Sequence, residues 1–301
     1  MNSSELLASV KRGISVPANQ TRFTDADILA IADEEIQTKL LPVLLSLRQE
    51  YLVKNSSITL VANQSAYSVP YRAIGRTLRS LATTQNNQKS FLQYIDPSDV
   101  EYTGTTNTGT PSSFYFEGDS FILVPTPNAA TTLEVKYEIQ CNNLAIVSDC
   151  GLISAINTVG NYVTLTSVPT SLVTGATVDF IQGKAGNTLI DIDKAITNVS
   201  GTNIYFTSLP STLVVGDWLA IAQTSPVVQL PREMHQVLAQ AVECRLLEAL
   251  GDFEGMGASS QKLSEKTNAM LSLLAPRQKG SQQKIVQFNG LLNRARSRFN
   301  A

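Results

Sequence analysis

The chain has 301 residues, which exceeds the usual size of one domain and predicts two compact units or one unit interrupted by another. Hydrophobic residues make up 43% and charged residues 16%, so the composition excludes wholesale disorder. The net charge of −2 excludes a whole-molecule attraction to nucleic acid or to an anionic membrane. The N-terminus has no apolar signal-peptide core, and no stretch approaches the roughly 18 apolar residues of a membrane span. We therefore expect a soluble, unexported chain.

Charge is distributed unevenly along the chain. Residues 276–301 contain six Lys or Arg and no Asp or Glu, so this basic C-terminal tail carries +6 and the rest of the chain −8. The tail spaces apolar side chains among basic ones, which is typical of a segment that becomes ordered on a partner. A solvated, disordered end and nonspecific contact of its arginines with DNA are the alternatives. The candidate partner-binding residues are Lys284, Ile285, Val286, Phe288, Leu291, Leu292, Arg294, Arg296, Arg298 and Phe299.

A long helix is predicted after an N-terminal extension over residues 1–22. Thr24 stands at an N-cap position with Asp27 three residues later, which is the spacing of a capping box. Apolar residues keep helical spacing from there to Tyr51. Pro42 removes one backbone donor, so we expect it to kink or divide this helix while the buried stripe continues.

β-Structure is expected next along the chain. Apolar residues alternate on both sides of an Asn-Gln-Ser turn between residues 58 and 69, which predicts a small hairpin. Three more alternating runs over residues 113–138, with a Glu-Gly-Asp turn after the first and two prolines after the second, predict a three-stranded meander. Helix and β-meander together predict the α+β class.

A repeat follows the meander. The stretch "TSVPTSLVTG" at residues 166–175 returns 41 residues later as "TSLPSTLVVG" at residues 207–216. Each copy reads as three short strands with one apolar face, and one such unit cannot bury that face alone. We therefore predict that residues 142–224 form an inserted all-β domain built from two 41-residue repeats, facing outward from the rest of the chain.

The constant offset of the repeat also predicts which side chains are buried. Val163 matches Ile204, and Leu165 matches Phe206, without any gap between the copies. If both copies fold alike, these matched residues occupy equivalent sites in one shared core. Exposure of Phe206 would contradict the duplication.

Helices return after the insert. Pro231 suits the first turn of a helix that Gly251 can end, and a second helix continues to Leu274. The glycines of "GMGASS" between them predict a hinge. These helices would share one core with the first helix and the meander. The predicted helical core domain therefore comprises residues 23–141 and 225–275, interrupted by the insert.

The sequence offers few residues in the arrangements that catalysis or metal binding requires. His235 is the only histidine and has Leu238 and Ala239 at helical spacing, so we predict a structural role for it. The sequence contains no H-E-x-x-H and no clustered cysteines to bind zinc. Asp191 and Asp193 resemble the opening of a calcium loop whose other ligands and central glycine are missing. We expect no enzymatic activity, no metal and no cofactor.

The three cysteines are an odd set without C-x-x-C spacing. Cys141 and Cys150 are close enough in the sequence for a bridge around a short loop. Free, partly buried thiols are the interpretation that we favour for these two and for Cys244.

Two motifs stand between the predicted opening helix and the closing helix. The pattern Y-x-(V/L)-P-x-x-A-I occurs as Tyr67, Val69, Pro70, Ala73 and Ile74. The pattern G-x-P-x-x-(F/Y)-x-x-x-G-x-x-I-x-(L/V)-x-P-x-P occurs as Gly109, Pro111, Phe114, Gly118, Ile122, Val124, Pro125 and Pro127. In style and order they resemble the head-to-tail adaptor proteins of tailed bacteriophages, over roughly residues 23–140 and 226–275.

The resemblance implies a structural virion protein that forms a ring, usually of twelve subunits, and joins the capsid portal to the tail. It implies three partners: further copies of the chain, the portal protein, which the C-terminal tail would bind, and a downstream tail, nozzle or tail-terminator protein. DNA would pass transiently without specific binding, which suits an acidic body. The chain would be assembled in the host cytoplasm and located in the virion neck, with no membrane. A β-rich tail, receptor-binding or baseplate protein is the alternative, and a carbohydrate-active enzyme is the third.

Overall fold

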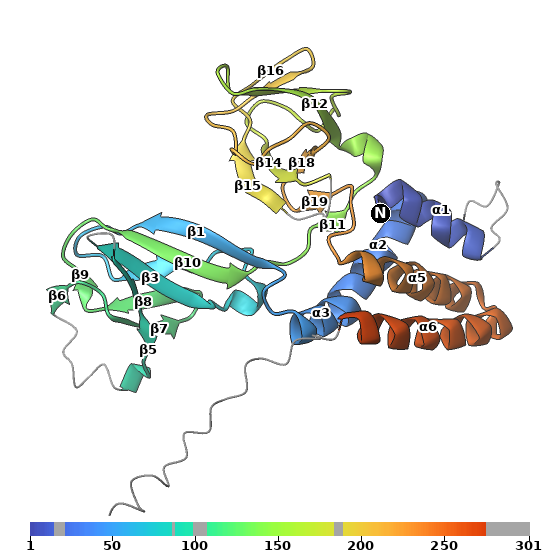
Figure 1. Ribbon diagram of the computed structural model, residues 1–301, viewed down its shortest axis with the longest axis horizontal. Helices are drawn as coiled ribbons and strands as arrows, with labels where there is room; N and C mark the ends of the chain where they lie inside the picture. Colours follow the sequence, from blue (N-terminus) through green and yellow to red (C-terminus); the bar gives the residue numbers. More distant parts are fainter. Residues whose placement is uncertain (15–21, 86–87, 99–106, 184–188, 275–301) are drawn as a thin grey trace, which may run out of the picture.

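The structure is a computed structural model of the chain, and it describes residues 1–14, 22–85, 88–98, 107–183 and 189–274. The described residues form helices and several largely antiparallel sheets, so the predicted α+β class is confirmed. In Figure 1 the helices form one lobe, two small sheets form a second, and a seven-stranded sheet forms a third that rises from the place where the other two meet.

The helical lobe is organised around one central helix. Its members are α1 (Ser3–Gly13), α2 (Asp25–Glu35), α3 (Leu41–Leu47), α5 (His235–Leu250) and α6 (Phe253–Leu274). Helix α5 packs against α1, α2 and α6, and most of its side chains in the first three turns are buried. The apolar stripes of α1, α2 and α6 therefore close around α5.

The long helix predicted after residue 23 is divided as expected. Thr24 and Asp27 form the capping box at the start of α2. A π-helical turn (Ile36–Leu40) separates α2 from α3, and Pro42, which cannot donate a backbone hydrogen bond, lies in the first turn of α3. The buried stripe runs through the wide turn and includes Leu44 at 0% exposure. The helix ends at Leu47, earlier than predicted.

Helix α1, within the predicted N-terminal extension, packs against the core of the helical lobe. Helix α1 buries Leu6 and Val10 in the main hydrophobic cluster. Its start is joined to the segment before α5, because the Ser3 amide donates to the Pro226 carbonyl at 2.7 Å and the Val228 amide donates to the Met1 carbonyl at 3.1 Å. The apolar residues of α1 need a surface to cover, and α5 provides it.

The β lobe contains two four-stranded sheets. One has the order β1 (Val53–Thr59), β10 (Thr132–Glu138), β3 (Ser80–Gln85), β4 (Gln88–Phe91). The other has the order β2 (Ala66–Ser68), β8 (Ser120–Val124), β7 (Ser113–Glu117), β5 (Gln93–Tyr94). Two further short strands, β6 (Thr108–Gly109) and β9 (Thr126–Pro127), pair beside them.

Two predictions for this lobe are wrong. Strands β1 and β2 do not form a hairpin, since each belongs to a different sheet. Strands β7 and β8 form the predicted hairpin, but β10 leaves it and pairs with β1 and β3. Pro125 and Pro127 lie between β8 and β10 and lack the amide hydrogens that a continuing ladder needs, so the chain changes sheets there.

The insert is a single sheet bent into two layers. Its order is β15 (Leu189–Ala195), β14 (Thr177–Ile181), β18 (Trp218–Ile221), β12 (Gly151–Asn157), β13 (Tyr162–Leu165), β17 (Asn203–Tyr205), β16 (Asn198–Ser200). The register of β12 shifts between Ile153 and Ala155, and this strand pairs with β18 at its first two residues and with β13 from Ile153 onward. The layers enclose a hydrophobic cluster separate from the main core.

The two repeats pair with each other about a local two-fold axis. Strand β14 pairs with its equivalent β18, so that Val178 lies opposite Ile221 and Phe180 opposite Leu219. Under the 41-residue offset each of these pairs maps onto the other. The matched residues that the sequence predicts to be buried are all buried: Val163 0%, Leu165 2%, Ile204 0% and Phe206 5% exposed.

The repeated ten residues encode the same turn twice. The Leu172 amide donates to the Pro169 carbonyl at 3.1 Å, and in the second copy Leu213 donates to Pro210 at 3.3 Å. Each stretch ends at a glycine with a positive φ, 86° at Gly175 and 95° at the equivalent position of the second copy. A side chain with a Cβ is disfavoured in that conformation, so the glycine recurs with the turn.

Candidate functional site: the joint between the helical domain and the β insert

The chain enters and leaves the insert side by side. Strand β11 (Asn143–Leu144) pairs in parallel with β19 (Thr224–Ser225). The Leu144 amide donates to both carboxylate oxygens of Asp33 on α2, at 2.9 and 3.0 Å. Burial raises the pKa of Asp33 to about 7, although this hydrogen bond lowers it. The entry strand is therefore held on the helical domain by a partly buried carboxyl group.

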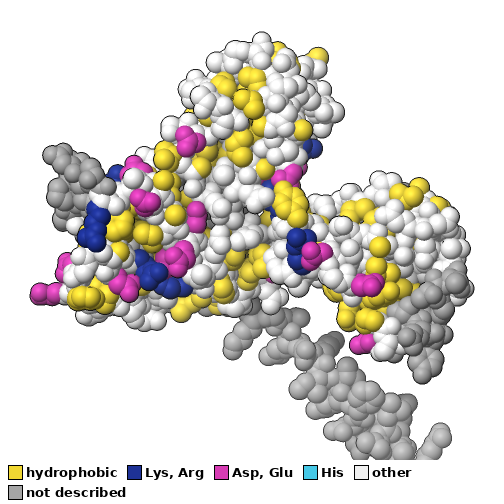
Figure 2. Space-filling view, turned by 180° about the vertical axis from the view of Figure 1, so that it is seen from behind, with side chains coloured by type: hydrophobic (Ala, Val, Ile, Leu, Met, Phe, Trp, Pro, Cys, Tyr) yellow, Lys and Arg dark blue, Asp and Glu magenta, His cyan; other side chains and the backbone are white. Residues whose placement is uncertain are grey.

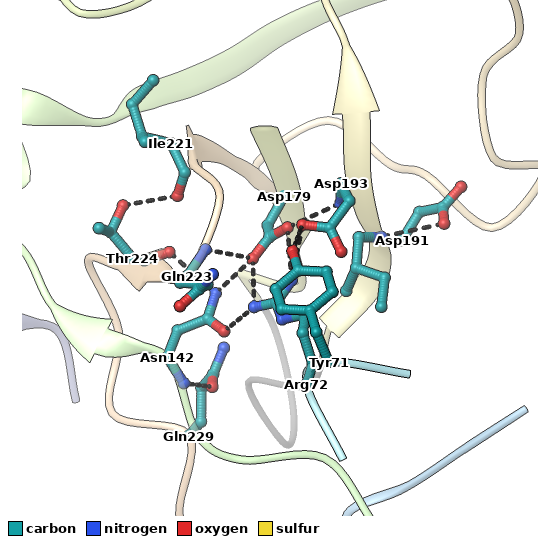
Figure 3. A network of polar contacts seen from close by, with 11 residues as sticks. Tyr71, Arg72, Asn142, Asp179, Asp191, Asp193, Ile221, Gln223, Thr224 and Gln229 are labelled. Carbon is teal, nitrogen blue, oxygen red and sulfur yellow. Dashed lines mark hydrogen bonds and ion pairs between the residues drawn. The ribbon is translucent and has the colours of Figure 1, made fainter. Parts of the chain in front are cut away.

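A buried arginine connects the β lobe to the insert. Arg72 follows β2, and its side chain is 5% exposed. Its Nη1 donates to Oδ1 of Asp179 on β14 at 2.9 Å, and its Nη2 donates to Oδ2 at 2.8 Å (Figure 3). This is a two-point pairing that guanidinium geometry favours. Burial alone would lower the pKa of Arg72, but the hydrogen bonds and charge of Asp179 raise it.

Asp179 receives further hydrogen bonds. The side-chain amide of Asn142 donates to its Oδ2 at 2.6 Å, and the backbone amides of Asp193 and Gln223 donate to the two oxygens at 3.0 Å each. The Asp179 side chain is 0% exposed. A carboxylate so far from water is stable only when it is paired and hydrogen-bonded, and the joint supplies both conditions.

A second carboxylate lies at the edge of the joint. The Tyr71 hydroxyl donates to Oδ1 of Asp193 at 2.6 Å, and Nη1 of Arg72 approaches the same oxygen at 3.4 Å. Asp193 has a positive φ of 55°, a conformation that Asp tolerates better than most residues. This conformation accompanies the hydrogen bond from its amide to Asp179. Burial raises the pKa of Tyr71, as does its hydrogen bond to Asp193.

The repeat symmetry is broken at this joint. Ala220 occupies the position equivalent to Asp179 and lies directly opposite it in β18. The other buried carboxylate of the insert, Asp217, likewise has Ala176 as its equivalent. Asp217 accepts hydrogen bonds from the amides of Val214 and Gly183 and stabilises a turn within the insert. The first repeat therefore supplies Asp179, which forms the two-point pair with Arg72, and the second repeat has no acidic side chain at the equivalent position.

The network continues toward α5 and borders a polar pocket. The backbone amide of Asn142 donates to Oε1 of Gln229 at 2.8 Å. Gln229 is 4% exposed. A pocket of about 280 Å³ lies beside the joint, and its lining is Gln37, Tyr71, Arg72, Gln140, Cys141, Asn142, Asn143 and Gln223. Most of the lining groups are amides, and one is the ion-paired guanidinium of Arg72. Hydrogen bonds and an ion pair of this kind can hold the insert in one orientation on the rest of the chain.

Sequence reasoning did not identify this joint. Tyr71 and Arg72 occupy the two unspecified positions after Pro70 in the first motif, and that placement was the one available signal. The ion pair itself spans 107 residues of sequence. Asp193, considered above as part of an incomplete calcium loop, contributes to the joint, and Asp191 pairs with Lys194 at 3.2 Å.

Of the other residues singled out in the sequence, the structure describes His235 but not the candidate residues of the tail. The ten candidate partner-binding residues of the tail, from Lys284 to Phe299, lie outside the described residues. His235 is buried, with its Nε2 2.9 Å from the Leu230 carbonyl and its Nδ1 3.4 Å from the Met1 amino group. Burial lowers the pKa of His235, and the nearby amino group lowers it further.

All three cysteines are free thiols in the structure. Burial raises the pKa of Cys141 and of Cys150 to about 12 in each case. Within the described ranges, no group of three His, Cys, Asp or Glu side chains could hold a metal ion. The part of the chain that the structure describes also lacks a helix with the length and apolar character of a membrane span.

The fold and the joint define a protein of two bodies, an α+β domain and a duplicated β insert, linked by a buried ion pair. The family model described as SU10 adaptor protein matches residues 1–176, more than half of the chain. The chain therefore belongs to this family of phage head–tail adaptors, which are structural proteins and not enzymes. No curated protein matches the chain.

The extent of the match differs from the resemblance seen in the motifs. It begins at residue 1 and so includes α1, which packs in the core. It ends at residue 176, within the first repeat. The second repeat and helices α5 and α6 lie beyond it, although their side chains complete both hydrophobic cores.

Proposed function

We propose that this chain is one subunit of a ring, usually of twelve copies, that joins the capsid portal to the tail in the neck of a phage virion. The observation that carries the proposal is the match of residues 1–176 to the phage adaptor family. Assembly would take place in the host cytoplasm. The third lobe in Figure 1, which projects from the place where the helices and small sheets meet, would be an arm on each subunit.

The charge distribution supports a DNA passage that does not bind DNA strongly. The chain without its C-terminal tail carries −8. Figure 2 shows acidic and basic side chains interspersed on the visible face of the helical lobe, without a continuous basic stripe. Strong contacts of Lys and Arg with phosphate would oppose transit, so this balance suits transient passage.

The basic C-terminal tail is the proposed portal-binding element. Residues 276–301 carry +6 and space apolar anchors among arginines. Apolar side chains would occupy pockets on the portal, and the arginines would pair with carboxylates. The opposite end of the ring would bind a downstream tail, nozzle or tail-terminator protein.

Attachment to portal-bearing capsids tests this proposal. Deletion of residues 284–301 should abolish co-sedimentation of the chain with capsids and leave its melting temperature nearly unchanged. Replacement of Arg294, Arg296 and Arg298 by Lys is the matched control, since it keeps charge but removes two-point pairing, and should reduce attachment only partly. Attachment that persists after the deletion would place the portal interface on the helical domain.

Two measurements test the remaining parts of the proposal. Negative-stain images of the purified chain, or of its complex with the portal, should show rings, and native mass should give the copy number. The chain should bind capsids emptied of DNA as well as it binds capsids filled with DNA. Loss of binding to emptied capsids would favour nonspecific contact of the tail with DNA.

We further propose that the chain has no enzymatic activity and needs no metal or cofactor. His235 is engaged with the Leu230 carbonyl and the Met1 amino group, and both contacts are structural. A stoichiometric transition metal in elemental analysis of the purified chain would contradict the proposal.

A further inference from the structure

The outer layer of the insert presents an ordered set of polar and aromatic side chains. Strands β12, β13, β17 and β16 form this layer, and in Figure 1 β12 and β16 lie at the end of the insert farthest from the helices. Val163 and Ile204 point inward to the core, so their neighbours in sequence point outward. The register places two rows across the layer, Asn157, Tyr162, Tyr205, Asn198 and Ala155, Thr164, Asn203, Ser200. These eight residues are called the outer face.

The centre of the outer face is a pair of tyrosines. The ring centroids of Tyr162 and Tyr205 are 5.0 Å apart, with 43° between the ring planes. The side-chain amide of Asn157 donates to the Tyr162 hydroxyl at 3.0 Å. A Cβ on Gly160 would lie 2.8 Å from the Tyr162 ring, so the glycine lets the turn pack closely beside this ring. The aromatic pair is therefore held in place before any ligand binds.

Amides and hydroxyls surround the tyrosines. Thr164 Oγ1 donates to Asn203 Oδ1 at 2.8 Å, which orients the Asn203 amide. Asn198 and Ser200 extend the rows to an exposed edge strand. Side-chain amides supply both donors and acceptors, as hydroxyl groups of a ligand require.

Charge is absent from this part of the sequence. No Asp, Glu, Lys, Arg or His occurs between Asp149 and Asp179, or between Lys194 and Asp217. In Figure 2 the end of the insert farthest from the helices shows no acidic or basic side chain on the visible face. A charged ligand such as nucleic acid or an anionic lipid would find no countercharge here.

We propose that the outer face binds an uncharged glycan. Aromatic rings present apolar faces to the C–H groups of a sugar, and the flanking amides and hydroxyls match its hydroxyl groups. A protein partner is less well matched, because the two rows have no Trp, Phe, Met or Arg beside their two tyrosines, and protein interfaces concentrate these residue types together. The proposal concerns the insert alone and does not depend on ring formation or portal binding.

The test uses the full chain on a printed array of neutral and anionic glycans, followed by titration with the neutral glycans that bind. The wild-type chain should bind at least one neutral glycan. Addition of about 0.5 M NaCl, roughly three times physiological ionic strength, should not weaken this binding. Tyr205→Ala should weaken binding by about tenfold or more, whereas Tyr205→Phe, which keeps the ring, should change it less than about threefold.

Two controls separate recognition from folding. Phe91→Ser removes another exposed aromatic side chain, on β4, and should leave binding unchanged. Asn198→Ala removes an exposed amide and should weaken binding several-fold without lowering the melting temperature, which decides the question if Tyr205→Ala unfolds the insert. The proposal is wrong if no neutral glycan on the array binds, or if Asn198→Ala and Tyr205→Ala both bind like the wild type.

Discussion

Val163 and Ile204 are separated by 41 residues in the sequence and lie directly opposite each other in strands β13 and β17, both with 0% exposure. Because each is the equivalent of the other in the repeat, their pairing places them on the local two-fold axis of the insert. The neighbouring pair Tyr162 and Tyr205 maps in the same way onto Thr164 and Asn203. The two copies therefore share one core instead of stacking two.

Truncation of that core should destabilise the insert. Phe206 is 5% exposed, and its ring centroid lies 5.0 Å from that of Phe180. Phe206→Ala should lower the free energy of unfolding by about 3 to 5 kcal/mol, measured by urea denaturation of the transition that Trp218 fluorescence reports. Val159→Ala, at a position 94% exposed, is the control and should change it by less than about 0.5 kcal/mol. Equal effects of the two variants would contradict the shared core.

Loss of the arginine at the joint should leave a buried charge without its partner. Arg72→Met should cost about 3 to 5 kcal/mol, because Asp179 at 0% exposure would keep hydrogen bonds but no countercharge. Combining it with Asp179→Asn should cost less than the sum of the two single changes, with a coupling of about 1 to 3 kcal/mol. Urea denaturation measures both quantities.

A nearby arginine provides the matched control for this prediction. Arg76 is 44% exposed and lies 4.0 Å from Asp119, so Arg76→Met should change stability by less than about 0.5 kcal/mol. Small-angle scattering should show a wider range of insert orientations for the Arg72 variant only. Unchanged scattering and full additivity would mean that Arg72 does not couple the two bodies.

Removal of the insert should leave the helical domain folded. The ends to be joined are close, since β11 and β19 are paired, so a short Gly-Ser linker can replace residues 145–223. With Arg72 retained, the shortened chain should lose stability, because the arginine loses Asp179 and Asp193. Adding Arg72→Met should recover part of the melting temperature. Loss of the helical circular dichroism signal in both versions would show that the insert belongs to the main core.

Asp33 should make stability depend on pH. Its folded pKa of about 7 lies above the ordinary value of 3.8 for an aspartate, so the folded state binds more protons between these values. This contribution to stability is fully present below pH 3.8 and is lost as pH rises toward 7 and above. Asp33→Asn keeps an oxygen for the Leu144 amide and should stabilise the chain at pH 8 by roughly 1 to 2 kcal/mol, since partial solvation reduces the effect.

The pH profile of the difference between the Asp33 variant and the wild type isolates this group. His235 acts in the opposite direction, because its lowered pKa removes stability as pH falls below 6.5. It is present in both chains, so its contribution cancels from the difference. A difference in unfolding free energy that stays constant between pH 4.5 and pH 8 would show that Asp33 is not the titrating group.

Local chemistry in the sequence determined the start of α2, the division near Pro42 and the burial of the repeat. Capping by Thr24 and the missing amide hydrogen of proline act within one helical turn, and a buried apolar stripe follows from side-chain periodicity. The repeat was visible because both copies need the same turn, with a glycine at positive φ. These features could therefore be predicted without knowledge of the partners.

Only the tertiary structure decided which strands pair and how the two bodies meet. Strands β1 and β2 each have the alternation of a hairpin strand, but alternation specifies a buried face and not the neighbour that covers it. Arg72 and Asp179 are 107 residues apart, and each alone reads as an ordinary charged residue. Burial turns them into a specific pair, because a charge removed from water requires an opposite charge within hydrogen-bonding distance, and only the fold brings the two together.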